Sequence, residues 1–350
     1  MSKVIKIKKG KNIHLQGPAE RIAIKAKPAE TYAVKPSDFV GIRPKLLIEK
    51  GDKVKAGSPL FYDKYQADVM FTSPVSGEII NINRGDRRKL LEIVIKADKQ
   101  QEFIEFTKSN PKDLDKNQII VNLQQSGLWP SIKQRPYNVI ANAKDTPKAI
   151  FISAFDTAPL AADVDFLVKD DKNNFQTGID ALSKLTNGTI HININNDYPA
   201  AETLTKAKGV QINRFTGPHP AGNVGIQINK INPINKGETI WTISPQKVIS
   251  IGRLFNKGQY DASKIIALAG SEIKNPKYYK IIDGANISNL LEDNLLSNNN
   301  RYISGNVLTG TKISKNGFVS YYDSLISVIP EGNYYDFLGW ALPGLKKYSF

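Results

Sequence analysis

The sequence predicts an α+β protein of several domains, because stretches with three different patterns follow one another along its 350 residues. Short apolar stretches separated by turn residues fill roughly the first hundred positions. Apolar runs then alternate with helix-like stretches, and a pattern of two strands, one helix and further strands follows. We therefore expect domains at 1–100, 101–255 and 256–330, and we expect residues 331–350 to be the start of a truncated carboxyl-terminal segment.

The first domain is predicted to be a barrel-sandwich hybrid that includes the amino-terminal strands. Its glycines at Gly51, Gly57 and Gly77 each fit a turn that requires positive φ. Two such glycine-cornered halves, related by a hairpin, resemble the fold of biotinyl and lipoyl carrier domains over residues 41–97. The predicted strands are Val4–Ile7, Ile22–Lys25, Leu46–Ile48, Val69–Phe71, Glu78–Ile82 and Leu90–Ile95.

The second domain is predicted to be a Rossmann-like α/β domain. Ala149–Phe155 is a nearly continuous apolar run, typical of a strand buried on both faces of a sheet. Strands and helices at the observed spacing predict right-handed crossovers and a parallel sheet. The other elements are a helix at Lys116–Gln125 with Gly127 beyond it, a helix at Thr177–Leu185, a strand at Thr189–Ile194, a helix at Ala200–Lys208 and a strand at Val210–Phe215.

The third domain is predicted to be a β-grasp module of the soluble-ligand-binding type, because a helix separates one pair of strands from later strands. Asn286 is expected to cap this helix. The predicted strands are Lys264–Ala269, Tyr278–Ile282, Tyr302–Ile303, Phe318–Tyr322 and Leu325–Ile329. The apolar stretch that begins at Tyr334 leads us to expect that the chain lacks a carboxyl-terminal segment.

Composition restricts the chemistry of this chain. It has no cysteine, which excludes disulfides, thiolate nucleophiles and cysteine-ligated clusters, and its three histidines, His14, His191 and His219, are scattered. The net charge of +15 favours an anionic partner, which is nucleic acid, anionic lipid or an acidic protein. No apolar run approaches the roughly 18 residues that span a bilayer, and the amino terminus lacks the apolar core of a signal peptide.

Ordered motifs along the chain resemble those of one family, the A subunits of the bacterial Na⁺-translocating NADH:quinone oxidoreductases. The resemblance implies a peripheral subunit on the cytoplasmic side of the bacterial inner membrane, in a complex that oxidises NADH, reduces ubiquinone and exports Na⁺. It also implies that NADH, the flavins and the iron centres are bound by partner subunits, with membrane subunits among the partners. The motifs are Gly41-Ile42-Arg43-Pro44, Phe71-Thr72-Ser73-Pro74-Val75-Ser76-Gly77, Ile82-Asn83-Arg84-Gly85, Ser126-Gly127-Leu128-Trp129, Arg135-Pro136, Asp156-Thr157, Gly217-Pro218-His219-Pro220-Ala221-Gly222, Ile303-Ser304-Gly305 and Gly339-Trp340-Ala341.

The residues also favour a chain without a tightly bound cofactor. The flavoprotein subunit of complex I, which the second domain resembles, wraps its flavin phosphate with a glycine-rich loop that corresponds here to residues 126–133. That stretch keeps one glycine, while Trp129 fills space and Pro130 lacks an N–H donor. No Gly-x-Gly-x-x-Gly run follows Ala149–Phe155 either, so we predict no dinucleotide site there.

Two alternative functions stay open at this point. A biotinyl- or lipoyl-type carrier would need a lysine eight residues before Pro74, where Gln66 stands, with Lys64 two places away. A basic nucleic-acid-binding protein would use the positive charge, but no recognised nucleic-acid motif occurs and the lysines are not interleaved with aromatic residues. We therefore expect no nucleic-acid partner.

Five residues are candidate contacts for ubiquinone or a partner subunit, and no catalytic residue or metal ligand is predicted. Trp129, Lys133 and Arg135 form one cluster, although Trp129 also suits a core or interface anchor. Asp156 follows a central strand, where open sheets place ligands, or forms a cap or an Asx turn. His219 lies in a Pro-His-Pro loop, where it could deliver a proton to reduced quinone or bond to the backbone.

Overall fold

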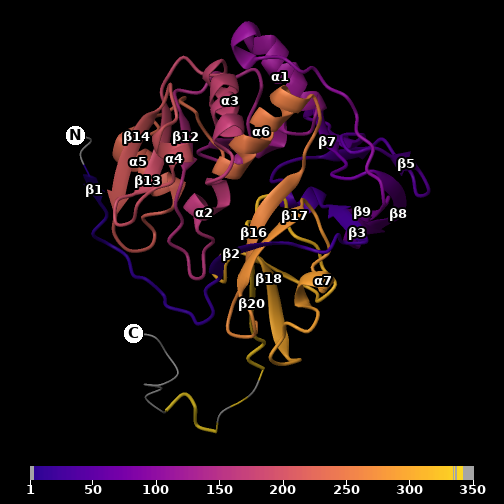
Figure 1. Cartoon of the computed structure of the whole chain (residues 1–350), viewed down its shortest axis with the longest axis vertical. Coiled ribbons are helices and arrows are strands. Elements are labelled where there is room, and N and C mark those ends of the chain that lie inside the picture. The colour runs from indigo at the N-terminus through magenta and orange to yellow at the C-terminus, as the bar shows by residue number, and fades with distance from the viewer. Residues whose placement is uncertain (1–3, 334, 336, 342–350) are drawn as a thin grey trace.

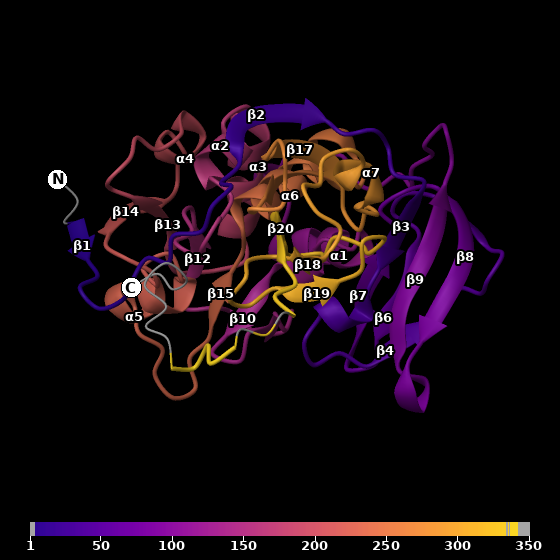
Figure 2. The same ribbon diagram turned by 90° about the horizontal axis from the view of Figure 1, so that it is seen from below.

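The structure, a computed structural model, describes residues 4–333, 335 and 337–341. The strands of this part of the chain form sheets of seven, six, four and three strands. The seven-stranded sheet lies at one end of the molecule and the four- and three-stranded sheets lie at the other, with the six-stranded sheet beside both (Figures 1 and 2). The segment expected at 331–350 lies largely outside the described residues.

The seven-stranded sheet is the centre of an α/β domain. Along β12, Ile150 and Ile152 pack on the side of α3 and α6, whereas Phe151 packs against α5 on the opposite side. Helices therefore cover both faces. In spatial order the strands are β1 (Val4–Lys6), β14 (Gln211–Thr216), β13 (Ile190–Asn195), β12 (Ile150–Ser153) and β15 (Ile240–Thr242), all parallel, then β10 (Lys133–Arg135) and β11 (Val139–Ile140), each antiparallel to its neighbour.

Three helices of this domain were predicted and occur in that order, two of them with changed bounds, and three further helices were not predicted. The helix α1 spans Lys116–Gln125 as predicted, and a capping box between Asp115 and Gln118 fixes its start. The predicted helix at Ala200–Lys208 is a single turn, because the Lys208 N–H bonds to the Gln176 side chain instead of continuing a helix. The remaining helices are α2 (Val164–Val168), α3 (Lys172–Ser183), α4 (Glu202–Thr205), α5 (Val224–Ile231) and α6 (Pro245–Lys257).

Two smaller sheets enclose the apolar core of the first domain. Phe61 and Phe71 stack with ring centroids 4.5 Å apart, and Ile79, Ile93 and Ile95 are fully buried beside them. One sheet contains β3 (Thr31–Val34), β9 (Leu90–Ala97), β8 (Gly77–Arg84) and β5 (Lys53–Val54), and the other contains β4 (Pro44–Leu46), β6 (Pro59–Asp63) and β7 (Gln66–Thr72). Short 3₁₀ helices occur at Pro36–Asp38 (η1), Asp86–Arg88 (η2), Pro111–Asp113 (η3) and Trp129–Ser131 (η4).

The amino-terminal strands, which the sequence analysis grouped with the first domain, do not pair with these two sheets. The strand β1 pairs with β14 of the α/β domain, and β2 (Glu20–Lys25) pairs with β17 of the six-stranded sheet. Both pairings are parallel and both strands lie at sheet edges. An edge can accept a strand from anywhere in the chain, because pairing needs only free backbone groups. Local sequence patterns therefore could not assign these strands to a sheet.

The six-stranded sheet forms the third part of the molecule. Its helix α7 (Ser288–Leu291) follows Asn286, whose side chain accepts a hydrogen bond from the Ser288 N–H at 2.9 Å. In spatial order the strands are β19 (Thr311–Ile313), β18 (Asn300–Ser304), β20 (Leu325–Pro330), β16 (Ser263–Ala269), β17 (Lys277–Ile282) and β2.

The predicted strand at Phe318–Tyr322 is wrong, since residues 318–324 form a loop. Side chains from elsewhere bind its backbone in place of a neighbouring strand: Lys35 Nζ donates to Phe318 O, and Lys264 Nζ donates to Ser320 O. The Tyr321 N–H donates to Asp38 Oδ2 at 2.8 Å. This 318–324 loop contacts all three parts of the molecule and borders a cavity.

Candidate functional site

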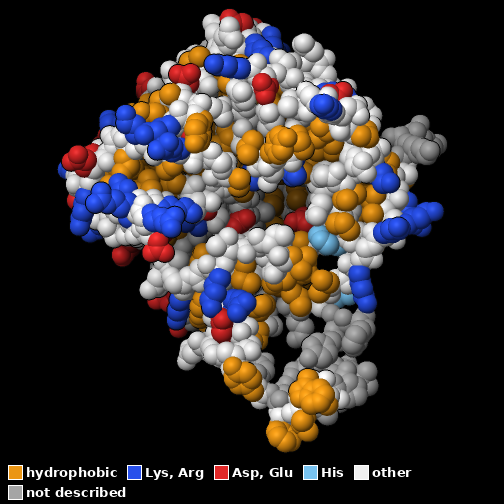
Figure 3. Space-filling view, turned by 180° about the vertical axis from the view of Figure 1, so that it is seen from behind, with side chains coloured by type: hydrophobic (Ala, Val, Ile, Leu, Met, Phe, Trp, Pro, Cys, Tyr) orange, Lys and Arg blue, Asp and Glu red, His pale blue; other side chains and the backbone are white. Residues whose placement is uncertain are grey.

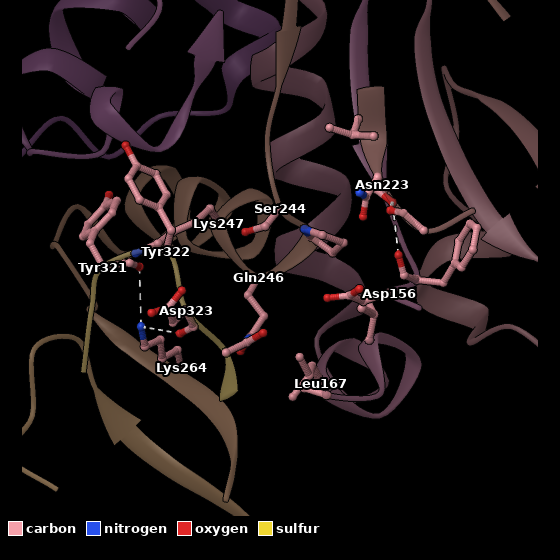
Figure 4. A pocket seen from close by; sticks show the side chains of 18 of the residues that line it. Asp156, Leu167, Asn223, Ser244, Gln246, Lys247, Lys264, Tyr321, Tyr322 and Asp323 are labelled. Carbon is pink, nitrogen blue, oxygen red and sulfur yellow. Dashed lines mark hydrogen bonds between the residues drawn. The ribbon is translucent and has the colours of Figure 1, made fainter. Parts of the chain in front are cut away.

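A cavity of about 550 Å³ lies between the α/β domain and the six-stranded sheet. Figure 3 shows a hollow near the centre of one face, with charged side chains at its edges, and Figure 4 shows side chains that line the cavity. Its walls are the end of β12, the starts of α5 and α6, strand β10, strand β16 and the 318–324 loop. The cavity therefore lies at the carboxyl ends of parallel strands, where open α/β sheets bind ligands.

The local sequence explains why helices begin at this cavity. Ser244-Pro245 starts α6 directly after the short strand β15, with proline in the first turn, where its missing N–H costs nothing. Gly222 and Asn223 precede α5, and a Cβ on Gly222 would lie 2.6 Å from the Thr157 nitrogen. Glycine is thus required at this position for the start of α5 to approach the loop after β12.

Strand β10 places one cation, Arg135, on a wall of the cavity and a second, Lys133, behind Tyr322. Lys133 and Arg135 are two residues apart, so both side chains leave the same face of the strand. Neither has a carboxylate within 4.0 Å among the described residues, and the buried Nε of Arg135 has no hydrogen-bond acceptor there. The Lys133 ammonium instead lies 3.5 Å from the centroid of the Tyr322 ring. Burial, with a smaller effect of Arg135, lowers the pKa of Lys133 to about 8.

The opposite wall contains a buried ion triad. Asp283 contacts Lys247 with Oδ2, and Lys264 Nζ lies 2.9 Å from Oδ1, with all three side chains at most 7% exposed. Burial alone would raise the pKa of Asp283, but the two ammonium groups outweigh burial and lower it. Lys264 also donates to Asp323 O at 2.9 Å, while Lys247 lies 3.7 Å from the Tyr321 ring centroid. One carboxylate therefore serves two buried lysines.

Two tyrosines of the 318–324 loop separate these walls. The Tyr322 hydroxyl donates to Pro130 O at 2.6 Å, whereas the buried Tyr321 hydroxyl has no partner among the described residues. Burial raises the pKa of both tyrosines well above the usual value, so both are neutral at pH 7. In Figure 4 these rings, Lys247, Lys264 and Asp323 lie on one side of the cavity, with Asp156 and Asn223 on the other.

The five predicted contact residues do not form one cluster. Arg135 and Asp156 line the cavity, and Lys133 lies behind Tyr322. Trp129 is fully buried: its indole N–H donates to Ala141 O at 2.8 Å, and its ring meets Trp241 edge to face. Trp129 is therefore a core anchor, the alternative that its sequence position allowed.

Asp156 and His219 both lie on loops at the carboxyl edge of the sheet. Asp156 is exposed and accepts a hydrogen bond from the Ala158 N–H at 2.8 Å, which is the predicted Asx turn. His219 Nδ1 lies 3.1 Å from Thr157 Oγ1, and its backbone N–H donates to Asn12 Oδ1. Asp156 thus borders the cavity, while His219 lies next to the loop that holds it without lining the cavity itself.

The stretch 126–133, where related flavoproteins were expected to hold a phosphate, is filled by side chains. Ser126, Leu128 and Trp129 are fully buried, and a Cβ on Gly127 would lie 2.2 Å from Thr72 Oγ1. The loop therefore packs against β7 and leaves its backbone no open space.

Sequence reasoning missed the triad and the 318–324 loop. A charged residue within an apolar strand, as Lys264 is within β16, was the available signal. Lys247 and Asp283 gave no signal, because their partnership joins residues 36 positions apart.

Two features are absent from the part of the chain that the structure describes. None of its helices combines the length and apolarity needed to cross a bilayer. No group of three or more acidic, histidine or cysteine side chains among these residues is arranged to hold a metal ion.

The carrier alternative can be located in the fold. Gln66 begins β7 after a tight turn that contains Lys64 and Tyr65, both exposed. This turn is the expected hairpin tip, with glutamine at the position where a carrier would have its modified lysine.

Comparison with known families gives three adjacent matches. Residues 5–98 match the NqrA N-terminal barrel-sandwich hybrid domain, residues 114–260 match the NqrA second alpha/beta domain, and residues 265–315 match the NQRA C-terminal domain. The predictions of a barrel-sandwich domain and of a second α/β domain are confirmed. The narrower Rossmann-like and β-grasp assignments stay predictions.

Curated relatives match nearly the whole chain. The A subunit of the Na(+)-translocating NADH-quinone reductase of Yersinia pseudotuberculosis is 37% identical over 99% of this chain and 78% of its own length. The corresponding protein of Pasteurella multocida is 36% identical with the same coverage. Among solved structures, an NAD⁺-reducing [NiFe]-hydrogenase in the air-oxidised state aligns with 54% of this chain and 41% of its own, at 11% identity and a TM-score of 0.37, which is too low to support an argument.

Proposed function

The chain belongs to the family of A subunits of the Na⁺-translocating NADH-quinone reductases, and from this membership we propose that it is a peripheral subunit on the cytoplasmic side of the bacterial inner membrane. The complex is an oxidoreductase and a translocase, and we propose that it couples NADH oxidation and ubiquinone reduction to Na⁺ export. The observation that carries the proposal is the 37% identity over 99% of the chain, with the family's domains matched in order.

Within the complex we assign this chain a structural role, with NADH, flavins and iron centres bound by partner subunits, including membrane subunits. The complete absence of cysteine supports this division, since cysteine-ligated clusters cannot form. The packing of residues 126–133 into the core supports it as well, because a flavin phosphate would need that backbone to be open. The absorbance spectrum of the purified chain tests the assignment, and a flavin or cluster band near one equivalent would refute it.

The basic charge supports a position beside the membrane. The chain has a net charge of +15, and each Lys or Arg near an anionic bilayer surface gains about 1 kcal/mol. Charge-dependent binding alone would be salt-sensitive, so the subunit should need its protein partners to stay bound at high salt. Retention on washed membranes from cells with and without the other subunits measures this.

A contribution to the quinone site is a second candidate role, favoured by the loops at the carboxyl edge of the sheet. Asp156 is exposed there, and His219 is held beside it through Thr157. The Nε–H group of Arg135 has no acceptor among the described residues, so a quinone carbonyl oxygen could accept a hydrogen bond from it. These groups belong to separate elements, so a partner subunit would have to complete the site.

Substitution in the assembled complex tests this second role. If His219 supplies a proton to reduced quinone, His219→Ala should lower quinone-reductase turnover about a hundredfold, because a positioned general acid contributes at least that much. Arg135→Ala should raise the KM for quinone. His14→Ala, in an exposed amino-terminal segment, is the matched control. Unchanged turnover and KM in both test variants would exclude quinone contact by these residues.

A further inference from the structure

One cation that lines the cavity between the α/β domain and the six-stranded sheet has no ion pair among the described residues. Arg135 lines one wall and Lys133 lies behind Tyr322, and neither has a carboxylate within 4.0 Å among the described residues. On the other wall, Lys247 and Lys264 share Asp283. A cation that loses water without gaining a partner is destabilising, so this arrangement is unexplained by folding alone.

The carboxylates near the cavity form no ion pair with Arg135 or Lys133. Asp283 is occupied by the two lysines of the triad. Asp323 Oδ2 accepts from Ser304 Oγ at 2.7 Å, and Asp156 accepts from the Ala158 N–H across an Asx turn. Arg135 therefore keeps the fork of its guanidinium group available, and that fork binds phosphate or carboxylate oxygens in pairs.

Two further features of the walls suit a phosphate. The helices α5 and α6 both begin at the cavity, and each adds unpaired N–H groups and the positive end of a helix dipole. Phe155, Tyr321 and Tyr322 also line it, so a planar ring attached to the anion would meet aromatic side chains. A volume of about 550 Å³ falls within the usual range for small-ligand sites.

We propose that this cavity binds a phosphate-bearing organic anion of about mononucleotide size, with Arg135 as its charged contact, Lys247 on the opposite wall and Lys133 as a further positive charge behind Tyr322. The inference goes beyond the proposed function, because it concerns a ligand of this chain alone. It requires no redox step and no membrane partner. It also places the anion outside residues 126–133, which are packed into the core.

Lys133 supplies a signature of occupancy that a surface contact would not give. Its pKa of about 8 is lowered by burial and by Arg135, while Asp323 and Asp38 raise it, and the Tyr322 ring lies beneath the ammonium. An anion in the cavity should raise this pKa. Near pH 8 binding should therefore take up a proton, and the measured heat should depend on the ionisation enthalpy of the buffer.

Calorimetric titration of the purified chain tests the proposal with adenosine 5′-monophosphate, inorganic phosphate, citrate and adenosine as probes. The monophosphate should bind saturably, phosphate more weakly and adenosine not at all. Arg135→Gln should weaken binding about tenfold or more, which corresponds to 1.4 kcal/mol or more. Lys133→Met should remove the proton uptake at pH 8. Arg84→Gln, on the exposed β8–β9 hairpin, is the matched control and should change affinity less than about twofold.

Three outcomes would overturn the proposal. The first is the lack of saturable binding of both monophosphate and phosphate at about 10 mM, a concentration that detects even weak sites. The second is an equal loss in Arg135→Gln and Arg84→Gln, which would indicate an adventitious ion only. The third is citrate binding more tightly than the monophosphate, which would assign the site to carboxylates. A thermal melt of each variant shows whether it is folded. Loss of quinone-reductase turnover in the complex would leave these results unaffected, so the two proposals fail separately.

Discussion

The α/β domain meets its two neighbours in opposite ways. Against the barrel-sandwich domain, α1 and η4 pack on β7, the Thr72 hydroxyl donates to Ser126 O at 2.9 Å, and Gly127 presses on the same threonine. Against the six-stranded sheet, the contact between α6 and β16–β17 contains the ion triad Lys247–Asp283–Lys264. We call these the apolar joint and the charged joint.

The difference shows how one domain combines a fixed contact with an open one. Gly127 lets the apolar joint approach Thr72 closely, and the cavity that remains beside Phe39 and Phe71 has only about 30 Å³. The charged joint, in contrast, has a cavity of about 550 Å³ beside it. Buried ion pairs seldom add stability over apolar packing, so the charged joint is the better candidate for a function.

The largest expected effect comes from breaking the charged joint. Asp283→Asn should lower the free energy of unfolding by about 3–5 kcal/mol at pH 7, because it leaves two buried ammonium groups without a counter-charge. Denaturant unfolding measures the loss. The pKa of Asp283 is lowered in the folded state, so its contribution is present above the unfolded value of 3.8 and disappears as pH falls through the folded value.

A double variant shows whether the loss belongs to the triad. In Lys247→Met/Asp283→Asn one lysine is removed with the carboxylate, and Lys264 keeps its bonds to the carbonyls of Ser320 and Asp323. The double variant should therefore lose less than the sum of the single variants. Strict additivity would show that the joint does not depend on this ion triad.

The sequence predicted those elements of the α/β domain whose start, end or burial is determined by neighbouring residues. The helix α1 begins at a capping box and ends before Gly127, so both of its bounds could be predicted from neighbouring residues. The apolar run around β12 predicted a buried parallel strand for the same reason. Two residues that the sequence singled out, Asp156 and Arg135, line the cavity, and their contact with a ligand stays a prediction.

The rest depends on contacts between distant residues. Lys264 lies in β16 and Asp283 directly follows the neighbouring strand β17, but Lys247 reaches them from a helix of another domain. The 318–324 loop carries apolar residues at strand-like spacing, yet its backbone bonds to Lys35, Asp38 and Lys264. Trp129 is likewise a core residue because its indole N–H bonds to Ala141 O, a contact that its own sequence position does not reveal. No pattern within a window of sequence contains this information.

The apolar joint can be tested at Gly127, with an intermediate expected effect. Gly127→Ala should cost about 2 kcal/mol or more, because the residue has φ +78° and the new Cβ would lie 2.2 Å from Thr72 Oγ1. Gly209→Ala is a close control, with φ +76° and no atom within 4 Å of its Cβ. Gly209→Ala should lower the free energy of unfolding by about 1 kcal/mol through backbone strain alone. The difference between the two variants therefore measures how tightly the joint is packed around Gly127. Equal losses would mean that the joint yields to a methyl group.

The smallest expected effect has the opposite sign and sharpens the comparison most. Lys133→Met should raise the free energy of unfolding by about 1 kcal/mol at pH 7, because it removes a charge that burial disfavours, while the lost contact with the Tyr322 ring offsets part of the gain. The pKa of Lys133 is about 8 in the folded state and ordinarily 10.5, so between these values the unfolded chain binds more protons. Wild-type stability should therefore rise with pH over that window, and the advantage of Lys133→Met should shrink. A destabilised variant at pH 7, with no pH dependence above 8, would show that the aromatic contact outweighs burial and that this wall is built for stability. A stabilised variant that also binds phosphate more weakly would show that the wall gives up stability to hold an anion.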